Sequence, residues 1–153
     1  MALRFKKIEF SDLNVLCEWH KEHCKINFPD SKYKRAPFYA KLWSNYQTMT
    51  LDDKITILLK LVDKNKMIGF LWLKLEQDCF KDLFYCDLHY IQILPEYRGK
   101  GIGVKMIKKA QQWAKKQKCK EVRLGTSVTN KEAIGLYHKC GYKIKRVLME
   151  KKI

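Results

Sequence analysis

The sequence has no long apolar run and very little proline. No stretch approaches the roughly 18 to 20 apolar residues of a membrane span, and the first ten residues, MALRFKKIEF, lack the apolar segment of a secretory signal peptide. The three prolines mark no linker, and no segment repeats. We therefore expect one cytoplasmic domain over residues 1–153, with no membrane partner.

Cysteine motifs are also missing, although the chain contains six cysteines. None forms a C-x-x-C pair, so reduced, buried thiols are expected rather than a disulfide framework. Cys17, His20 and Cys24 share one face of an expected helix, next to His23, which leaves a zinc site as an alternative. Since a single helix rarely supplies every ligand of a tetrahedral site, we expect no metal.

Arginine and acidic residues are scarce, whereas lysine is abundant. The chain has 27 lysines, 5 arginines and 16 acidic residues, and its net charge is +16. Such a charge attracts polyanions, but arginine is the residue usually selected for phosphate and base recognition. Two interpretations stay open: a basic module that binds nucleic acid weakly, or a solvated lysine-rich surface.

Hydrophobic periodicity predicts an alternating series of strands and helices. Strands are expected at 3–9, 54–62, 67–75, 83–94, 121–128 and 143–150, and helices at 12–23, about 36–48, 102–117 and 129–141. Only the long helical connections can join parallel neighbours. The fold class is therefore α/β, with a mixed, mostly antiparallel sheet flanked by helices.

Four residues are expected to delimit helices. Ser11 is the expected N-cap of the first helix, and Thr129 with Glu132 forms a capping box before the last one. Gly141 stands where a left-handed residue commonly follows a helix.

The stretch RGKGIGV, residues 98–104, places three of the seven glycines between an expected strand and an expected helix. Its spacing, G-x-G-x-G, matches neither the dinucleotide fingerprint nor the Walker loop. A turn with free N–H groups at a helix N-terminus still suits a pyrophosphate. The alternative is a turn that uses glycine only for tight packing.

This loop, the preceding HYIQILPEY and the later NKEAIGLYHKCGY together resemble the GCN5-related N-acetyltransferase (GNAT) family. The resemblance implies a GNAT-type acyl-CoA N-acyltransferase fold with acetyl-CoA as co-substrate. It also implies that the strand at 84–94 splays from 121–128, so that pantetheine lies in the gap. The cofactor-binding residues that it implies are Ile91, Ile93, Arg98, Gly99, Lys100, Gly101, Ile102, Gly103, Val104, Asn130 and Tyr137.

The resemblance further implies that Tyr137 donates a proton to the CoA sulfur, although a tyrosine on the inner face of a helix is more often core. Asp87 occupies the position of a family carboxylate, and His89 lies two residues on, on the same strand face. Gly125 stands where some relatives have a second histidine. The base thus stays open between Asp87, His89 and attack by an amine that binds already neutral.

The function predicted from the sequence is direct acetyl transfer from acetyl-CoA to an amine of a protein, peptide or small molecule. The alternative is a non-enzymatic basic module that binds nucleic acid or a ribosomal surface. A monomer or a homodimer is expected. The aromatic residues of the first two helices either line the acceptor pocket or fill core.

Overall fold

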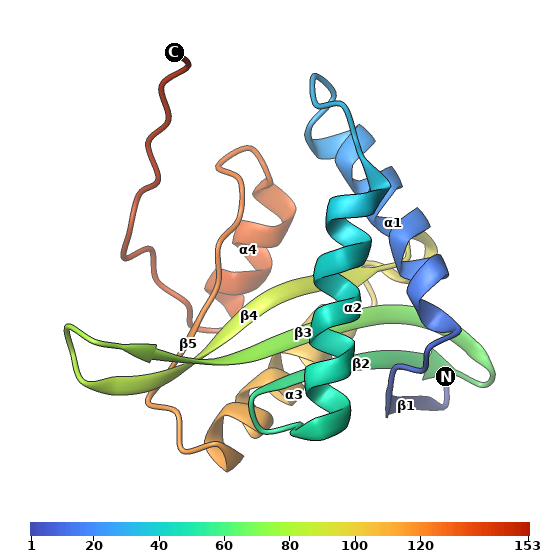
Figure 1. The fold of residues 1–153 in the computed structure, drawn as a ribbon, viewed down its shortest axis with the longest axis horizontal. Helices are drawn as coiled ribbons and strands as arrows, with labels where there is room; N and C mark the ends of the chain where they lie inside the picture. Colours follow the sequence, from blue (N-terminus) through green and yellow to red (C-terminus); the bar gives the residue numbers. More distant parts are fainter.

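A computed structural model describes residues 1–153 as a five-stranded sheet with helices on both faces (Figure 1). The elements in chain order are β1 (Leu3–Lys7), α1 (Asp12–Asn27), α2 (Arg35–Leu51), β2 (Thr56–Asp63), β3 (Lys66–Asp78), β4 (Leu83–Ile93), a 3₁₀ turn (Pro95–Tyr97), α3 (Ile102–Lys116), β5 (Glu121–Arg123) and α4 (Lys131–Lys139). No helix is both long enough and apolar enough to cross a bilayer.

The strands follow one another across the sheet in the order β1-β2-β3-β4-β5. The first four pair antiparallel, and β5 pairs parallel to β4 because α3 carries the chain back across the sheet. In Figure 1, α1 and α2 cover the near face, whereas α3 and α4 lie behind it. With both faces covered, β2 and β3 are buried along most of their length. The predicted fold class is confirmed.

Helix α3 has the two faces that its sequence predicted. Its buried residues are Ile102, Met106, Ile107, Ala110, Trp113 and Ala114, all part of one core cluster. Most of its lysines are exposed on the opposite face. Burial of this apolar stripe holds the helix against β3 and β4 and so fixes the position of its N-terminus.

Ser11 stands at the N-cap position of α1 as predicted but makes no capping bond, and the predicted Thr129 cap of α4 is wrong. Ser11 has helical backbone angles and makes no capping bond, whereas the Asp12 carboxylate accepts from the Glu9 N–H at 2.7 Å. Helix α4 is capped by Asn130, whose side chain accepts from the Ala133 N–H at 3.2 Å. The capping residue is therefore Asn130, one position after the predicted Thr129, and its side chain bonds to the N–H three residues on, as N-caps usually do.

The predicted glycine at the end of α4 is confirmed. Gly141 has φ +85°. The Tyr142 N–H donates to the Tyr137 carbonyl at 3.0 Å, and the Gly141 N–H donates to the His138 carbonyl at 3.0 Å. These two bonds form a Schellman motif, which satisfies carbonyls at the end of the helix.

Two strand predictions are wrong in extent or existence. The strand expected at 121–128 is observed only as β5, which has three residues. β5 pairs with β4 only at Tyr85–Asp87, and the chain after Arg123 has no strand partner. The strand expected at 143–150 is absent, and its apolar side chains, Ile144, Val147, Leu148 and Met149, are exposed. Residues 143–150 alternate apolar and polar side chains as a strand would, but they do not pair with the outer edge of β5, which is the last strand of the sheet. In Figure 1 the C-terminal segment runs away from the sheet.

Two glycines of the α4 region make a matched test of this helix end. Gly141→Ala should lower the free energy of unfolding by about 1–2 kcal/mol, since a left-handed backbone strains any residue with a Cβ. Gly135→Ala, inside α4 with open space at its Cβ position, should raise it by about 0.5–1 kcal/mol. Urea unfolding measures both, and an unchanged stability in Gly141→Ala would contradict the Schellman assignment.

Candidate active site

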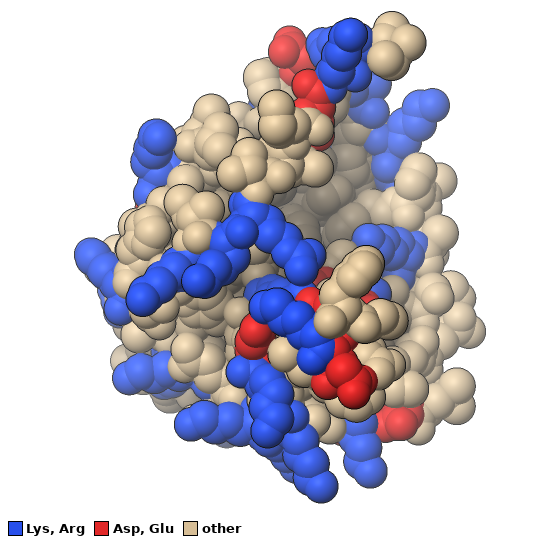
Figure 2. Space-filling view, turned by 90° about the vertical axis from the view of Figure 1, so that its left-hand side faces the viewer, with Lys and Arg blue, Asp and Glu red and all other residues tan.

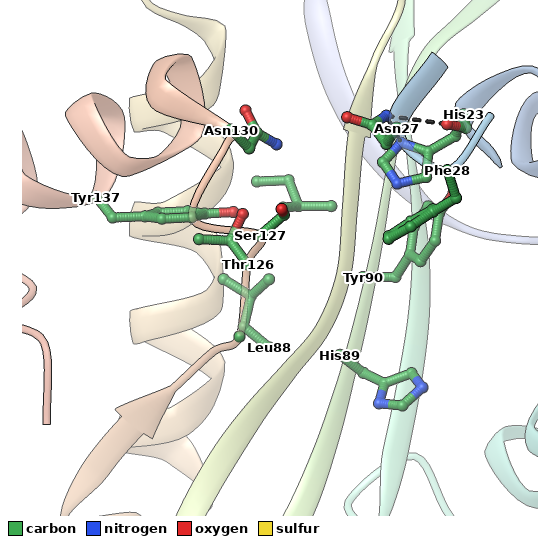
Figure 3. A pocket seen from close by; sticks show the side chains of 12 residues that line it. His23, Asn27, Phe28, Leu88, His89, Tyr90, Thr126, Ser127, Asn130 and Tyr137 are labelled. Carbon is green, nitrogen blue, oxygen red and sulfur yellow. Dashed lines mark hydrogen bonds between the residues drawn. The ribbon is translucent and has the colours of Figure 1, made fainter. Parts of the chain in front are cut away.

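A cavity of about 190 Å³ opens where the C-terminal end of α1 meets the end of β4 and the segment before α4. Figure 3 shows its walls, with Tyr137 on one side of β4 and His23 and Phe28 on the other. The lining residues are His23, Asn27, Phe28, Leu88, His89, Tyr90, Ile91, Gly125, Thr126, Ser127, Asn130 and Tyr137. They come from four separate parts of the sequence, which only the fold brings together.

The cavity exists because β4 parts from β5. β5 pairs with Tyr85–Asp87 only, so the remainder of β4 has no strand along that edge. The pairing of β4 with β3 also shifts register between Trp72 and Leu73, which leaves His89 without a paired residue in the bulge. The predicted splay of this strand from β5 is therefore present.

The glycine loop presents a row of unpaired donors beside this opening. Gly99 and Gly101 have φ +73° and +75°, and nothing lies within 4 Å of a Cβ built at either position. The backbone N–H groups of residues 99–104 donate to no acceptor in the protein. They lie at the N-terminus of α3, where the helix dipole adds partial positive charge. The loop therefore has the donors and the field that an anion needs.

Gly103 serves a different purpose from the two glycines before it. A Cβ at this position would lie 2.7 Å from Leu136 Cδ2, so the glycine allows α3 to approach α4 closely. Tight packing thus explains Gly103, whereas Gly99 and Gly101 are needed for their left-handed backbone conformation.

Two basic side chains of the loop, Arg98 and Lys100, are exposed. Arg98 Nε donates to the Ile93 carbonyl at 3.2 Å, which ties the loop to the end of β4. The Lys100 ammonium lies 5.4 Å from the centre of the Tyr97 ring. Ile91 lines the cavity, whereas Ile93 does not and its carbonyl is already occupied by Arg98.

Tyr137 and Asn130 both face the cavity from α4. Tyr137 is 8% exposed, and burial raises the pKa of its phenol. Its hydroxyl has no hydrogen-bond partner in the protein, and Figure 3 shows it directed toward Ser127 and Thr126. Asn130 lines the same wall while it caps α4. A protonated phenol in a cavity beside a free strand edge is suited to proton donation.

Asp87 and His89 form the pair that the sequence placed on one strand face. Asp87 Oδ2 lies 2.9 Å from His89 Nδ1, and the His89 ring packs edge-on against Trp72 at 4.5 Å. His89 lines the cavity but Asp87 does not. Figure 3 shows the imidazole turned away from the Tyr137 side.

His20, which lies between Cys17 and Cys24 on α1, packs against side chains of α1, α2 and β4. No group of three or more His, Cys, Asp or Glu side chains lies in positions suited to a metal. His20 Nδ1 contacts Tyr90 OH at 3.1 Å, its Nε2 lies 3.5 Å from Cys24 Sγ, and its ring stacks on Phe38 at 3.7 Å. Burial, with the nearby His23, lowers the pKa of His20 to about 4.

The sequence interpretation missed the end of α1. His23, Asn27 and Phe28 line the cavity, although His23 was noted only as a neighbour of the cysteine set. Of the aromatic residues in the first two helices, Phe28 lines the cavity, whereas Phe38, Tyr39 and Trp43 pack against the core. No local spacing marks these residues, because α2, β2 and β3 lie between them and β4 in the sequence.

Basic side chains on one face of the molecule are interspersed with acidic ones. Figure 2 shows lysines and arginines distributed across the face that carries the hairpin between β3 and β4, with acidic side chains among them. Arg123 is enclosed in ion pairs with Asp78 and Glu121. On this face, the mixture of charges favours a solvated surface over a nucleic-acid platform.

Comparison with known proteins places the chain in a family. Residues 13–142 match the Acetyltransferase (GNAT) family. The chain belongs to the GNAT family. This match covers most of the sequence, and it includes the glycine loop, the splayed strands and α4.

Relatives of this GNAT chain match it over shorter segments. An uncharacterized N-acetyltransferase of Methanocaldococcus jannaschii is 40% identical over 62 residues, 40% of this chain and 27% of that protein. The thialysine N-epsilon-acetyltransferase of Mus musculus is 44% identical over 50 residues, 33% of this chain and 29% of that protein. The matched segments thus span less than a third of either relative.

A solved structure shows the same fold over the whole chain. AAC(6')-Iy, in complex with the bisubstrate analogue CoA-S-monomethyl-acetylneamine, superposes with a TM-score of 0.74 at 16% identity. The alignment covers 100% of this GNAT chain and 99% of the other.

The buried histidine generates a prediction on acid stability. The folded pKa of His20 is about 4 against an ordinary 6.5, so between these values the unfolded chain binds more protons and stability should fall as pH drops from 6.5 to 4. His20→Gln should reduce this dependence of stability on pH. Part of the dependence should remain, because the pKa of His23 is also lowered in the folded protein. Urea unfolding at several pH values measures the slope, and an identical slope in both proteins would contradict the burial of neutral His20.

Proposed function

We propose that this protein is an acetyl-CoA-dependent N-acetyltransferase that moves the acetyl group directly to an amine. The observation that carries the proposal is the run of six free backbone N–H groups at 99–104 beside the parting of β4 from β5. Membership of the GNAT family supports it, because proteins with this fold use acetyl-CoA.

The residues present fit CoA in two places. Free N–H groups and the α3 dipole suit the pyrophosphate, and Arg98 holds the loop that presents them. The unpaired edge of β4 suits the pantetheine arm, whose amides can pair with backbone near Ile91 as an added strand would. Asn130 lies beside that path. The thioester then enters the cavity between Tyr137 and His89.

The reaction requires one bond to form and one to break. The lone pair of the amine attacks the thioester carbonyl carbon, and the C–S bond of the resulting tetrahedral adduct then breaks. One proton leaves the nitrogen, and one is added to the departing thiolate. No cysteine lines the cavity, so transfer without an acyl-enzyme is the path that the site supports.

Tyr137 is proposed as the acid that protonates the thiolate. Its phenol is held in the protonated form by burial, and its hydroxyl faces the cavity without a competing partner in the protein. A phenol that stays protonated at neutral pH has a proton to give when a thiolate forms beside it.

His89 is proposed as the base, positioned by Asp87. When the Asp87 carboxylate accepts from Nδ1–H, the lone pair of the imidazole is left on Nε2. Asp87 itself does not reach the cavity, so it acts by fixing the tautomer rather than by contact with the amine. Because the His89 ring is turned away from Tyr137, a water molecule is proposed to carry the proton to it.

The glycine loop gives a direct test of the donor site. Gly101→Ala should weaken CoA binding about tenfold or more, since the left-handed backbone that presents the N–H groups becomes strained. Gly135→Ala, on α4 with open space at its Cβ position and no left-handed backbone, is the matched control and should bind CoA unchanged. Calorimetry with CoA measures both, and a folded wild-type protein that does not bind CoA would overturn the proposed function.

The acid is tested separately from binding. Tyr137→Phe should lower kcat by about 10²-fold or more with little change in CoA affinity, because the ring is kept and only the proton donor is lost. Thiol release from acetyl-CoA with a panel of amines and peptides measures the rate. An unchanged kcat, with chemistry rate-limiting, would show that Tyr137 is only part of the core.

A further inference from the structure

One wall of the cavity carries a hydrogen-bond donor that the proposed reaction does not use. His23 lines the cavity from α1, opposite Tyr137 (Figure 3). Its Nδ1 lies 3.2 Å from Asn27 Nδ2, whereas its Nε2 has no partner in the protein. Figure 3 shows one ring nitrogen turned to Asn27 and the other turned away from it.

The contacts of Asn27 determine which nitrogen of His23 carries the proton. Asn27 Nδ2 donates to the His23 carbonyl at 2.9 Å, and a carbonyl can only accept, so this atom is the amide nitrogen rather than the oxygen. The same NH₂ group faces His23 Nδ1, which must therefore accept. The neutral ring then bears its proton on Nε2.

The surroundings keep the ring neutral. Protonation of Nδ1 would set an N–H against the amide NH₂ of Asn27. Burial and the nearby positive charge of Arg98 also lower the pKa of His23. The other titratable groups that face the ring are His20 on α1 and Tyr90 on β4, at centroid distances of 6.3 and 5.8 Å. Both are neutral at pH 7, because burial lowers the pKa of His20 and raises that of Tyr90.

The charge of the cavity limits what this donor can bind. None of the lining residues is a carboxylate, and Asp87 is engaged by His89 outside the lining. A polyamine would place a second ammonium group in a cavity that has no anion to neutralise it. An Nε2–H that has no partner in the protein can instead donate to an oxygen of the substrate.

We propose that His23 Nε2–H binds a carbonyl or carboxylate oxygen next to the reacting amine, so that the acceptor is an amino acid, an amino acid amide or a peptide N-terminus rather than a polyamine. The inference rests on the proposed function and names the substrate class of the same site. His23 is thus a specificity-determining residue, and Asn27 is the residue that positions its proton.

Two acceptors and two variants test the hydrogen bond. Leucinamide and isoamylamine share a side chain, and only leucinamide has the carbonyl. His23→Leu should reduce the ratio of their kcat/KM values, leucinamide over isoamylamine, about tenfold. His23→Gln, which places an amide N–H near the position of Nε2, should keep most of the ratio. The different basicities of the two amines cancel, because the ratio is compared between proteins.

The tautomer has a test that does not depend on activity. Nitrogen chemical shifts of His23 should show the proton on Nε2 in the wild type. In Asn27→Asp the carboxylate accepts from Nδ1–H, so the proton should move to Nδ1 and the acceptor ratio should fall as in His23→Leu. A wild-type ring protonated on Nδ1 would overturn the assignment.

The outcomes separate this inference from the proposed function. No CoA binding and no thiol release with any amine would overturn the proposed function. If the protein binds CoA and transfers acetyl groups, but His23→Leu lowers kcat/KM equally for leucinamide and isoamylamine, only the role of His23 would be overturned. A wild-type preference for cadaverine over lysine at the same pH, unchanged in His23→Leu, would also overturn the substrate class.

Discussion

The divergence of β4 from β5 is the constraint on which the site depends. Backbone N–H and C=O groups need partners, yet β4 finds a parallel partner only at Tyr85–Asp87. Beyond that point the strand keeps β3 on one edge and leaves the other edge open to the cavity. The bulge at His89 follows in the same region, and it allows His89 to pack on Trp72 while the next residue, Tyr90, packs on Phe70.

A chain of polar contacts joins the end of α1 to this open strand. His20 Nδ1 contacts Tyr90 OH at 3.1 Å, the Tyr90 hydroxyl donates to Gln92 Oε1 at 3.2 Å, and Gln92 Nε2 returns to the Trp19 carbonyl at 3.2 Å. The directions are consistent, since a hydroxyl that donates to Gln92 accepts from His20. This closed set of bonds rigidifies the helix against the strand. It also holds His23, one turn further along α1, at the cavity wall.

The donor and acceptor sides of the cavity are built in different ways. The donor side uses main-chain groups: the free N–H groups of 99–104 and the open edge of β4. Such groups bind without regard to the side chains that carry them, so the glycines matter for conformation and close packing rather than for contact. The proposed acceptor side uses side chains of α1, where Asn27 fixes the nitrogen of His23 that carries the proton.

The sequence by itself determined most of the elements, their order and the glycine loop, because periodicity, glycine spacing and the family resemblance of 89–104 and 130–142 are local patterns. It also determined that Asp87 and His89 share a face and that Gly141 ends a helix. Only the tertiary structure decided that β5 is short, that 143–150 forms no strand, and that Asn130 rather than Thr129 caps α4. It alone placed His23 and Asn27 opposite Tyr137, because that meeting depends on how α1 packs across β4, a contact between residues far apart in the chain that no local spacing records.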